Sequence, residues 1–336
     1  MTQKPADKSQ HIIVIGGGAW GAAIATALST HDDHHIECLV RSEATKEALS
    51  AGHVPRLNGV SLPHPIPATT KPDCLAKADI IYLVLPAAAT SQMMAIIDRH
   101  TNNDIPIILC AKGLVLPDVD NRQEADACFL PDFMRCFYPD RPFALLSGPS
   151  FADEVIQGLP AALVAASDDP LLSDQMISHF SQSNLRLYQG HDVMGVAIGG
   201  TVKNVIALAA GISAGLGLGD NAKAALITRG LAETSRLITK LGGTAETMRG
   251  LAGIGDLTLS ASGPHSRNMA YGYALGSGTS LPDALSEGAR TAPLLAKMAE
   301  HIDCDMPITN AVRDALQGAN LQQIITDLLA RPAVEE

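Results

Sequence analysis

A short glycine-rich segment directly after a predicted strand constrains this chain more than any other feature. Residues 11–15 read His-Ile-Ile-Val-Ile, and residues 16–21 read Gly-Gly-Gly-Ala-Trp-Gly before a helical pattern begins. In such a strand–turn–helix, Gly16 permits the tight turn, Gly18 lets the backbone approach a ligand, and Gly21 allows the helix to pack closely on the strand. The N–H groups at the start of the helix attract pyrophosphate. The segment predicts a dinucleotide-binding site, with a purely structural glycine turn as the alternative.

The remainder of the first half alternates between strand-like and helix-like patterns. We expect strands at residues 11–15, 36–40, 79–85, 105–111, 143–146 and 161–165, and helices between them at residues 22–30, 43–51, 90–100 and 171–181. Several of the strands are unbroken apolar runs, which is typical of strands covered on both faces. This alternation predicts an α/β domain over residues 1–189, with a doubly wound parallel sheet of the Rossmann type.

The strand signal fades after residue 190, and helical patterns take its place. Residues 220–241 repeat apolar side chains at helical spacing, with Asp220 placed to cap the start and Gly242 to end the helix. Further helical patterns cover residues 281–285, 292–301 and 310–317. We therefore expect an all-α C-terminal domain over residues 190–336.

One apolar stretch, residues 193–218, is long enough to cross a bilayer. It contains six glycines, and its single charged residue, Lys203, lies near its middle. A lysine there costs about 2.5–3.5 kcal/mol to insert into a membrane. A buried helix is therefore the preferred interpretation.

Charge and cysteine usage narrow the functional class and the compartment. The formal net charge of −11 argues against a nucleic-acid binder, whose surface must attract phosphates. Six widely spaced cysteines without a C-x-x-C pair, and a polar N-terminus without a signal peptide, favour a cytoplasmic protein. The histidine-rich residues 31–35 are expected to form a solvated turn between helix and strand, not a metal site.

The residue that follows the second predicted strand bears on the choice of dinucleotide. An NAD-specific site usually carries Asp or Glu there, which accepts hydrogen bonds from the ribose hydroxyls. This chain has Arg41, which suits the 2′-phosphate of NADP. The sequence thus predicts NADP as the preferred cofactor with NAD as the other possibility, while a plain surface arginine is the alternative.

Four further segments carry residues suited to catalysis or to phosphate binding. Lys112 closes a predicted strand at residues 105–111, where ligands of such sheets gather. Lys203 is the only charge in an apolar stretch, and burial makes a lysine release its proton more readily. Asp256 is isolated among apolar and glycine neighbours, and it is placed either to pair with a lysine or to cap a helix. Ser266-Arg267-Asn268 offers a guanidinium fork suited to phosphate.

Taken together, these residues resemble the bacterial-type NAD(P)-dependent glycerol-3-phosphate dehydrogenases from about residue 11 to residue 330. The matching segments occur in the order of that family, and the Lys-Asn, Gly-Asp-Leu and Ser-Arg-Asn set is specific to it. They are residues 16–21, 111–114, 147–152, 202–205, 253–257, 266–268 and 287–288.

The resemblance implies catalytic roles for Lys203, as proton donor and acceptor, for Lys112, which contacts substrate and cofactor, and for Asp256, which holds Lys203. The substrate positions of the family fall on Lys112, Gly148, Ser150, Lys203, Asp256, Ser266, Arg267 and Asn268. The cofactor positions fall on Ala19, Trp20, Arg41, Lys112, Ala152, Arg267, Leu285 and Glu287, beside the loop glycines Gly16, Gly18 and Gly21. Ala19, Ser150 and Ser286 depart from the residues usual in the family, and none of these departures removes a group that the chemistry requires.

The implied reaction is reversible reduction of dihydroxyacetone phosphate to sn-glycerol 3-phosphate with NAD(P)H, which supplies glycerophospholipid synthesis. The family also makes a homodimer plausible. Two alternatives remain. One is another dehydrogenase with a Rossmann half and a helical half, of the 6-phosphogluconate or 3-hydroxyisobutyrate type, and the other is a non-catalytic NAD(P)-redox sensor.

Overall fold

The structure is a computed structural model, and it describes residues 9–55, 57, 59–117, 127–263, 266–282 and 286–329. The chain forms two compact units. The first consists of the residues up to Ala111 together with Pro131–Val193. The second consists of the short segment that starts at Lys112 and of the residues from Met194 onward.

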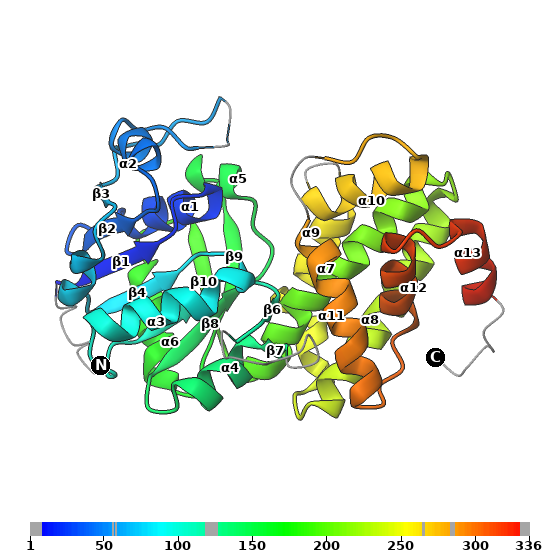
Figure 1. The fold of residues 1–336 in the computed structure, drawn as a ribbon. Coiled ribbons are helices and arrows are strands. Elements are labelled where there is room, and N and C mark those ends of the chain that lie inside the picture. The colour runs from blue at the N-terminus through cyan, green and yellow to red at the C-terminus, as the bar shows by residue number, and fades with distance from the viewer. Residues whose placement is uncertain are drawn as a thin grey trace. The chain divides into compact units, whose positions relative to one another are not determined.

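The first unit contains an eight-stranded sheet with the order β10-β9-β8-β5-β4-β1-β2-β3 (Figure 1). Its strands are β1 (His11–Ile15), β2 (His35–Leu39), β3 (Ala68–Thr69), β4 (Ile80–Leu83), β5 (Ile107–Leu109), β8 (Phe143–Ser147), β9 (Ala161–Ala166) and β10 (Leu185–Gly190). Its helices are α1 (Ala19–Leu28), α2 (Glu43–Ser50), η1 (Pro72–Lys77), η2 (Ala87–Ala89), α3 (Thr90–His100), α4 (Leu130–Phe137), α5 (Ala152–Ile156) and α6 (Pro170–His179).

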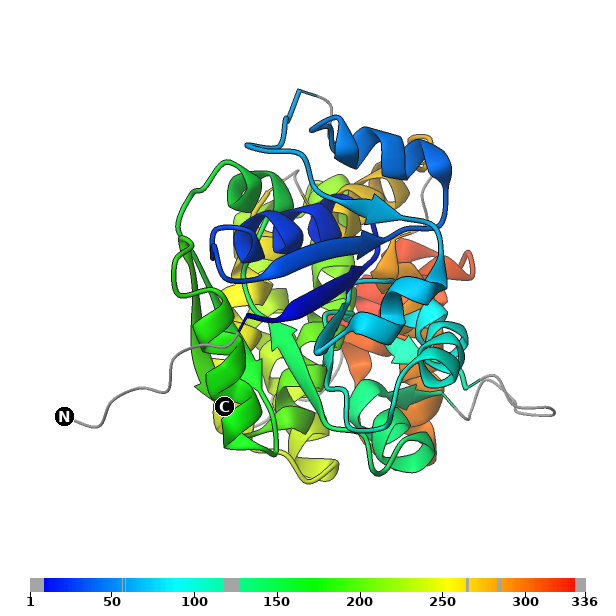
Figure 2. The same cartoon turned by 90° about the vertical axis from the view of Figure 1, so that its left-hand side faces the viewer.

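The predicted Rossmann-type architecture is confirmed. The strand order reverses beside β1, with β2 on one side and β4 on the other, and the adjacent β1 and β2 can be followed in Figure 2. The strands are covered on both faces, since every residue of β4 is buried. One core cluster joins the sheet face that carries Ile12 and Val14 to apolar side chains of α1, α5 and α6. Met94 and Ile97 of α3 are buried outside that cluster.

The predicted parallel sheet contains one antiparallel pairing, near one edge. β9 and β10 pair with each other in parallel, but β9 runs antiparallel to β8. The connection between β8 and β9 contains only the five-residue helix α5, which spans about 7.5 Å. The chain re-enters the sheet at the edge where β8 ends, and β9 runs back beside β8 from there.

The second unit is built from helices and one small hairpin. Its elements are β6 (Leu114–Val115), β7 (Cys128–Phe129), α7 (Val193–Gly215), α8 (Gly219–Lys240), η4 (Ala245–Arg249), η5 (Leu251–Gly255), α9 (Asp256–Ala261), α10 (Arg267–Ser277), α11 (Glu287–His301), α12 (Pro307–Leu316) and α13 (Leu321–Leu329). The predicted end of α8 is confirmed, because Gly242 directly follows its C-cap in the left-handed region. Its predicted cap is wrong: Asp220 lies inside the first turn and pairs with Lys223. Of residues 281–285, the structure describes only 281 and 282, which are not helical.

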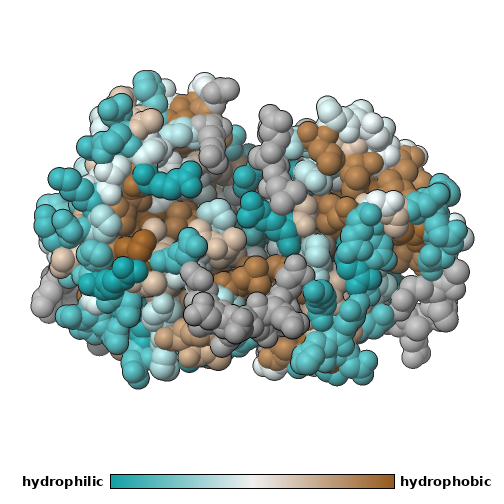
Figure 3. Space-filling view, viewed as in Figure 1, coloured by the Kyte–Doolittle hydropathy of each residue, from teal (hydrophilic) through white to brown (hydrophobic). Residues whose placement is uncertain are grey.

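The apolar helix α7 is the core of this unit. It is long and apolar enough to cross a membrane, but 89% of its most apolar window is buried within the fold. The buried cluster around it includes Ile198, Val202 and Val205 of α7 and Leu237 of α8. Figure 3 shows largely hydrophilic side chains on the surface over α8 and α12. The prediction of a buried helix is confirmed.

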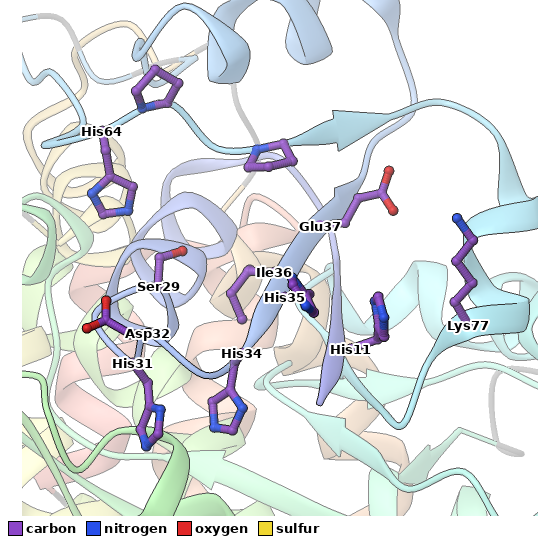
Figure 4. A pocket seen from close by; sticks show the side chains of 12 residues that line it. His11, Ser29, His31, Asp32, His34, His35, Ile36, Glu37, His64 and Lys77 are labelled. Atoms are coloured by element: carbon purple, nitrogen blue, oxygen red, sulfur yellow. The ribbon is translucent and has the colours of Figure 1, made fainter. Parts of the chain in front are cut away.

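The histidine-rich turn before β2 differs from its expected exposure. His31 and His34 are buried and stack on each other with ring centroids 4.3 Å apart. They line a hollow of about 520 Å³ together with His11, His35, His64 and others (Figure 4). Among the described residues, no group of three His, Cys, Asp or Glu side chains is arranged to hold a metal ion. The hollow lies at the amino ends of β1 and β2, opposite the glycine-rich segment.

Candidate active site

The glycine-rich segment forms a turn that only glycine can make at two of its positions. Gly16 follows β1 with φ +122°, and an added Cβ would lie 2.3 Å from the Val84 carbonyl oxygen. At Gly21, a Cβ would lie 1.8 Å from the carbonyl oxygen of Gly16. These two glycines therefore allow the turn and the start of α1 to pack against each other.

Gly18 has a different role in the same turn. A Cβ at Gly18 would meet nothing within 4 Å, so its backbone faces open space. Gly18 is also the N-cap of α1, without a side-chain cap, and no acidic residue lies in the first turn. α1 begins at Ala19, three residues before its predicted start, which brings Ala19 and Trp20 into that turn. Uncapped N–H groups beside an open backbone fit the pyrophosphate of a dinucleotide.

Other predicted residues lie along the same carboxyl edge of the sheet. Arg41 follows β2 and is exposed. Gly148 and Ser150 follow β8, where Gly148 has φ +141° and a Cβ would approach Leu163 within 3.0 Å. Ala152 is the first residue of α5, and Trp20 is half-buried and packs against the core. The carboxyl ends of parallel strands at a reversal of strand order are where such sheets bind ligands.

In the second unit, a buried carboxylate holds two lysines. Asp256 accepts hydrogen bonds from Lys203 Nζ at 2.5 Å through Oδ1 and from Lys112 Nζ at 2.6 Å through Oδ2. The Asp256 side chain is 1% exposed and the Lys203 side chain 10%, while that of Lys112 is 20% exposed. The pairing of Asp256 with a lysine is thus present, and it includes both lysines that the sequence analysis selected. Because two ammonium groups share one carboxylate, the cluster carries a net positive charge.

Close backbone packing brings these three residues together. Gly199 lies one helical turn before Lys203 on α7, and a Cβ there would come within 2.9 Å of the Ala252 carbonyl oxygen. At Gly253 a Cβ would lie 2.4 Å from the backbone of Met248. Both contacts press the η5 turn against its neighbours, and α9 begins directly after that turn with Asp256. The glycines before Asp256 therefore place its carboxylate at Lys203.

The electrostatics of the cluster act mainly on Lys203. Burial and the nearby Lys112 lower the pKa of Lys203 to about 8, although Asp256 opposes that shift. A lysine in this range exchanges its proton near neutral pH, as a general acid or base must. Desolvation combined with a specific charge partner is also the pattern expected of a functional residue.

Two polar partners of this cluster, Ser260 and Asn204, were given no role in the predicted site. Lys203 Nζ donates to Ser260 Oγ at 2.8 Å, and Ser260 is buried. Its spacing of four residues from Asp256 places it on the same face of α9, which is the signal that identifies it. Asn204 Nδ2 donates to the Lys112 carbonyl oxygen at 3.2 Å. Asn204 therefore ties α7 to the segment that carries Lys112.

The predicted phosphate-binding triplet begins α10, and its three residues differ in environment. Ser266 is the N-cap of the helix and accepts from Met269 N, so the capping role accounts for its hydroxyl. Arg267 is exposed. Asn268 Nδ2 donates to Asn204 Oδ1 at 2.9 Å, and its Oδ1 accepts from Gly288 N at 2.9 Å. Asn268 is thereby joined to the lysine cluster through Asn204.

Glu287, a predicted cofactor residue, begins α11 in the same unit. Burial raises the pKa of Glu287, and the positive charges of Arg290 and Arg267 oppose that shift. Glu287 therefore interacts electrostatically with Arg267. Leu285, another predicted cofactor residue, lies outside the described residues.

The structure therefore gathers the predicted residues into two groups, one in each unit. The first unit holds Gly16, Gly18, Ala19, Trp20, Gly21, Arg41, Gly148, Ser150 and Ala152, and the second holds Lys112, Lys203, Asp256, Ser266, Arg267, Asn268 and Glu287.

Comparisons with known proteins find relatives of both units. Residues 11–172 match the family described as NAD-dependent glycerol-3-phosphate dehydrogenase N-terminus, and residues 192–326 match its C-terminus. The chain is 38% identical over 332 residues to a glycerol-3-phosphate dehydrogenase [NAD(P)+] of Agrobacterium fabrum, covering 97% of this chain and 99% of that protein. It is 39% identical over 336 residues to the protein of that name from Mesorhizobium japonicum, covering 99% and 95%.

A solved structure is similar over nearly the same length. The crystal structure of glycerol-3-phosphate dehydrogenase from Coxiella burnetii superposes with a TM-score of 0.88 at 31% identity, and the alignment covers 96% of this chain and 99% of that one. The similarity therefore extends across both units.

Proposed function

Because this chain belongs to the NAD(P)-dependent glycerol-3-phosphate dehydrogenase family, we propose that it reversibly reduces dihydroxyacetone phosphate to sn-glycerol 3-phosphate. One observation carries the proposal: the buried cluster in which Asp256 binds Lys203 and Lys112. It gives a proton donor of suitable pKa beside a second positive charge. Both are required where a carbonyl becomes an alkoxide and then a hydroxyl.

The nicotinamide cofactor, when bound, supplies the hydride that adds to C2 of the substrate. As the C2 oxygen gains negative charge, Lys203 donates a proton to it, so the carbonyl becomes a secondary alcohol. Lys203 is left neutral and regains its proton from solvent. Acid catalysis of this kind contributes about 10²–10⁴-fold to the rate.

Lys112 and Asp256 support that proton transfer. Lys112 stabilises the developing charge on the oxygen and orients the carbonyl. Asp256 fixes Lys203 by a hydrogen bond of 2.5 Å. It also favours the protonated form of Lys203, since its charge acts to raise the pKa. A lysine ammonium has three N–H donors, and those to Asp256 and Ser260 leave one for the substrate.

The phosphate of the substrate is assigned to the start of α10. Arg267 is exposed, and its guanidinium would bind a phosphate through the paired N–H groups typical of arginine. Asn268 links that end of the helix to Asn204, next to Lys203. Ser266, Gly148 and Ser150 complete the proposed substrate residues. Binding energy from the phosphate serves to orient C2.

The cofactor is assigned to the glycine turn and its surroundings. Gly16, Gly18 and Gly21 bind the pyrophosphate, and Arg41 binds the 2′-phosphate of NADP, which we propose as the preferred cofactor over NAD. The other proposed cofactor residues are Ala19, Trp20, Lys112, Ala152, Arg267, Leu285 and Glu287. In this proposal residues 1–189 form the dinucleotide-binding domain and residues 190–336 form the helical catalytic and substrate-binding domain. Lys112, Gly148 and Ser150 of the first range also contribute to catalysis or substrate binding.

The proposal also covers the setting of the enzyme. We place it in the cytoplasm, as a homodimer without nucleic-acid partners, where its product supplies glycerophospholipid synthesis. The 6-phosphogluconate and 3-hydroxyisobutyrate dehydrogenase types lack support from the matched families. A redox sensor has no use for a buried Lys203–Asp256–Lys112 cluster.

The test follows absorbance of the reduced nicotinamide with dihydroxyacetone phosphate, using NADPH and NADH in parallel. We expect rapid oxidation of both, and faster oxidation of NADPH at equal low concentration. Equal rates would remove the preference for NADP. Absence of oxidation, in protein that binds the cofactors, would contradict the proposed substrate.

A further inference from the structure

The carboxyl end of β2 carries an acidic side chain that two neighbours hold in place. Glu43, the first residue of α2, stands two residues after Arg41. Its Oε1 accepts a hydrogen bond from Thr70 Oγ1 at 2.5 Å, and its Oε2 accepts one from Lys46 Nζ at 2.9 Å. Each carboxylate oxygen therefore has a hydrogen-bond partner other than Arg41.

The contact with Thr70 follows from the pairing of β2 with β3. These strands run parallel, and Val40 N donates to the Thr69 carbonyl oxygen at 2.9 Å. The residues after the two strands, Arg41 and Thr70, therefore lie at the same edge of the sheet. The contact with Lys46 is a pair three residues apart on α2. The two contacts thus come from different elements and reach the carboxylate independently.

Arg41 itself makes no hydrogen bond or ion pair with the part of the chain that the structure describes. An arginine and a carboxylate two residues apart at a strand end would be ready partners, since such pairs form strong bidentate hydrogen bonds. The hydrogen bonds from Thr70 and Lys46 lower the pKa of Glu43, so its carboxylate is ionised at neutral pH. An ionised carboxylate that was not held would compete for the guanidinium and repel a phosphate.

We propose that Thr70 and Lys46 set the cofactor preference of this enzyme by holding the Glu43 carboxylate away from Arg41, which leaves the guanidinium available for the 2′-phosphate of NADPH. The inference rests on the assignment of Arg41 in the proposed function. It makes Glu43 a specificity-determining residue, although it does not itself bind the cofactor. When the contacts of Thr70 and Lys46 with Glu43 are lost, Glu43 pairs with Arg41. The affinity of the protein then falls only for the dinucleotide that carries the 2′-phosphate.

The test measures binding of 2′,5′-ADP and of ADP by calorimetry, so no turnover is needed. In the double variant Thr70→Val with Lys46→Met, we expect the affinity for 2′,5′-ADP to fall about three- to fivefold, the range of an exposed ion pair. The affinity for ADP stays unchanged. Adding Glu43→Gln to that double variant restores binding of 2′,5′-ADP, because the amide no longer competes for Arg41.

Lys223→Met is the matched control, since it breaks a similar i,i+3 pair with Asp220 on α8 in the other unit. It leaves both affinities unchanged. Unaltered binding of 2′,5′-ADP in the double variant would overturn the inference. Failure of Glu43→Gln to restore binding would also overturn it, because the positive charge of Lys46 alone would then explain the loss.

Arg41→Ala separates this inference from its premise. It should lower affinity for 2′,5′-ADP at least as much as the double variant. If Arg41→Ala has no effect, the assignment of Arg41 fails and the inference with it. Whether the protein reduces dihydroxyacetone phosphate is read separately in the absorbance assay.

Discussion

The glycine turn of the first unit offers backbone groups to its proposed ligand, whereas the lysine cluster of the second unit offers charged side chains. The turn at residues 16–21 offers N–H groups and open space at Gly18, and contacts with other backbone atoms require glycine at Gly16 and Gly21. The cluster at Lys203 consists of polar side chains that bind one another. Lys203 and Asp256, which share a hydrogen bond, are 53 residues apart in the sequence. The difference predicts that substitutions in the first site change cofactor binding or folding, while substitutions in the second change turnover.

The strongest test of this division is Asp256→Asn. The two ammonium groups would lose their shared counter-charge, and the pKa of Lys203 would fall below about 8, because Asp256 acts to raise it. A smaller fraction of Lys203 would then be protonated at neutral pH. We expect kcat for reduction to fall about 100-fold or more, with cofactor binding unchanged. Steady-state rates and NADPH fluorescence titration measure the two effects.

Asp220→Asn is the matched control, since it removes an exposed carboxylate that pairs with Lys223. It should leave kcat unchanged. A loss of NADPH affinity in Asp256→Asn equal to its loss of turnover would break the separation between the two sites.

Two substitutions within the glycine turn test the proposed cofactor site of the first unit. In Gly18→Ala the added Cβ has room in the protein but enters the space assigned to the pyrophosphate. We expect KM for both cofactors to rise by roughly tenfold, or about 1.4 kcal/mol, with kcat and thermal stability retained. In Gly21→Ala the Cβ would lie 1.8 Å from the Gly16 carbonyl oxygen, so the turn must move.

Gly21→Ala should therefore lower the free energy of unfolding by about 1–3 kcal/mol, measured by urea denaturation. Each variant is the control for the other. Equal effects of both on stability would contradict the assignment of Gly18 as an open face toward the ligand.

The pH dependence of kcat/KM tests the lysine cluster in the unmodified protein. Reduction needs protonated Lys203, whose pKa is about 8. Its rate should be level below that pH and fall about tenfold per pH unit above it. Oxidation of sn-glycerol 3-phosphate needs the neutral form, so its rate should fall below pH 8 and be level above. Profiles that bend in the same direction for both reactions would rule out Lys203 as the shared acid and base.

The smallest expected effect is that of Ser260→Ala. Lys203 would lose one acceptor while keeping Asp256. A hydrogen bond of this kind contributes about 0.5–1.5 kcal/mol, so kcat should fall about two- to tenfold. Ser260→Thr keeps the hydroxyl and should recover most of the rate. If the threonine variant is as slow as the alanine variant, packing at Ser260 is the cause.

Much of the first unit was predictable from sequence because its signals are local. The strand before the glycine turn was predicted with its observed bounds, and the helix that follows was predicted to within three residues of its start. The edge strand β10 was missed, since its exposed Arg186 and Tyr188 interrupt the apolar pattern. The two-residue strands β6 and β7 are too short to give any pattern.

The lysine cluster required more than local signals. Lys112 and Asp256 are 144 residues apart, and neither periodicity nor charge pattern indicates that they touch. Their selection came from isolated charges in apolar surroundings and from the family resemblance. The burial of His31 and His34 was missed for a related reason: a polar turn in sequence can be covered by a distant segment, as it is here beside His179.

We propose above all that Lys203 of the buried lysine cluster donates the proton when the bound nicotinamide cofactor reduces dihydroxyacetone phosphate. The most direct measurement compares Lys203→Ala with the unmodified protein for NADPH oxidation by dihydroxyacetone phosphate and for NADPH binding in the same samples. The account predicts rapid oxidation by the unmodified protein, and in the variant a loss of about 10²–10⁴-fold with NADPH bound as before. Turnover by Lys203→Ala at the rate of the unmodified protein would contradict it.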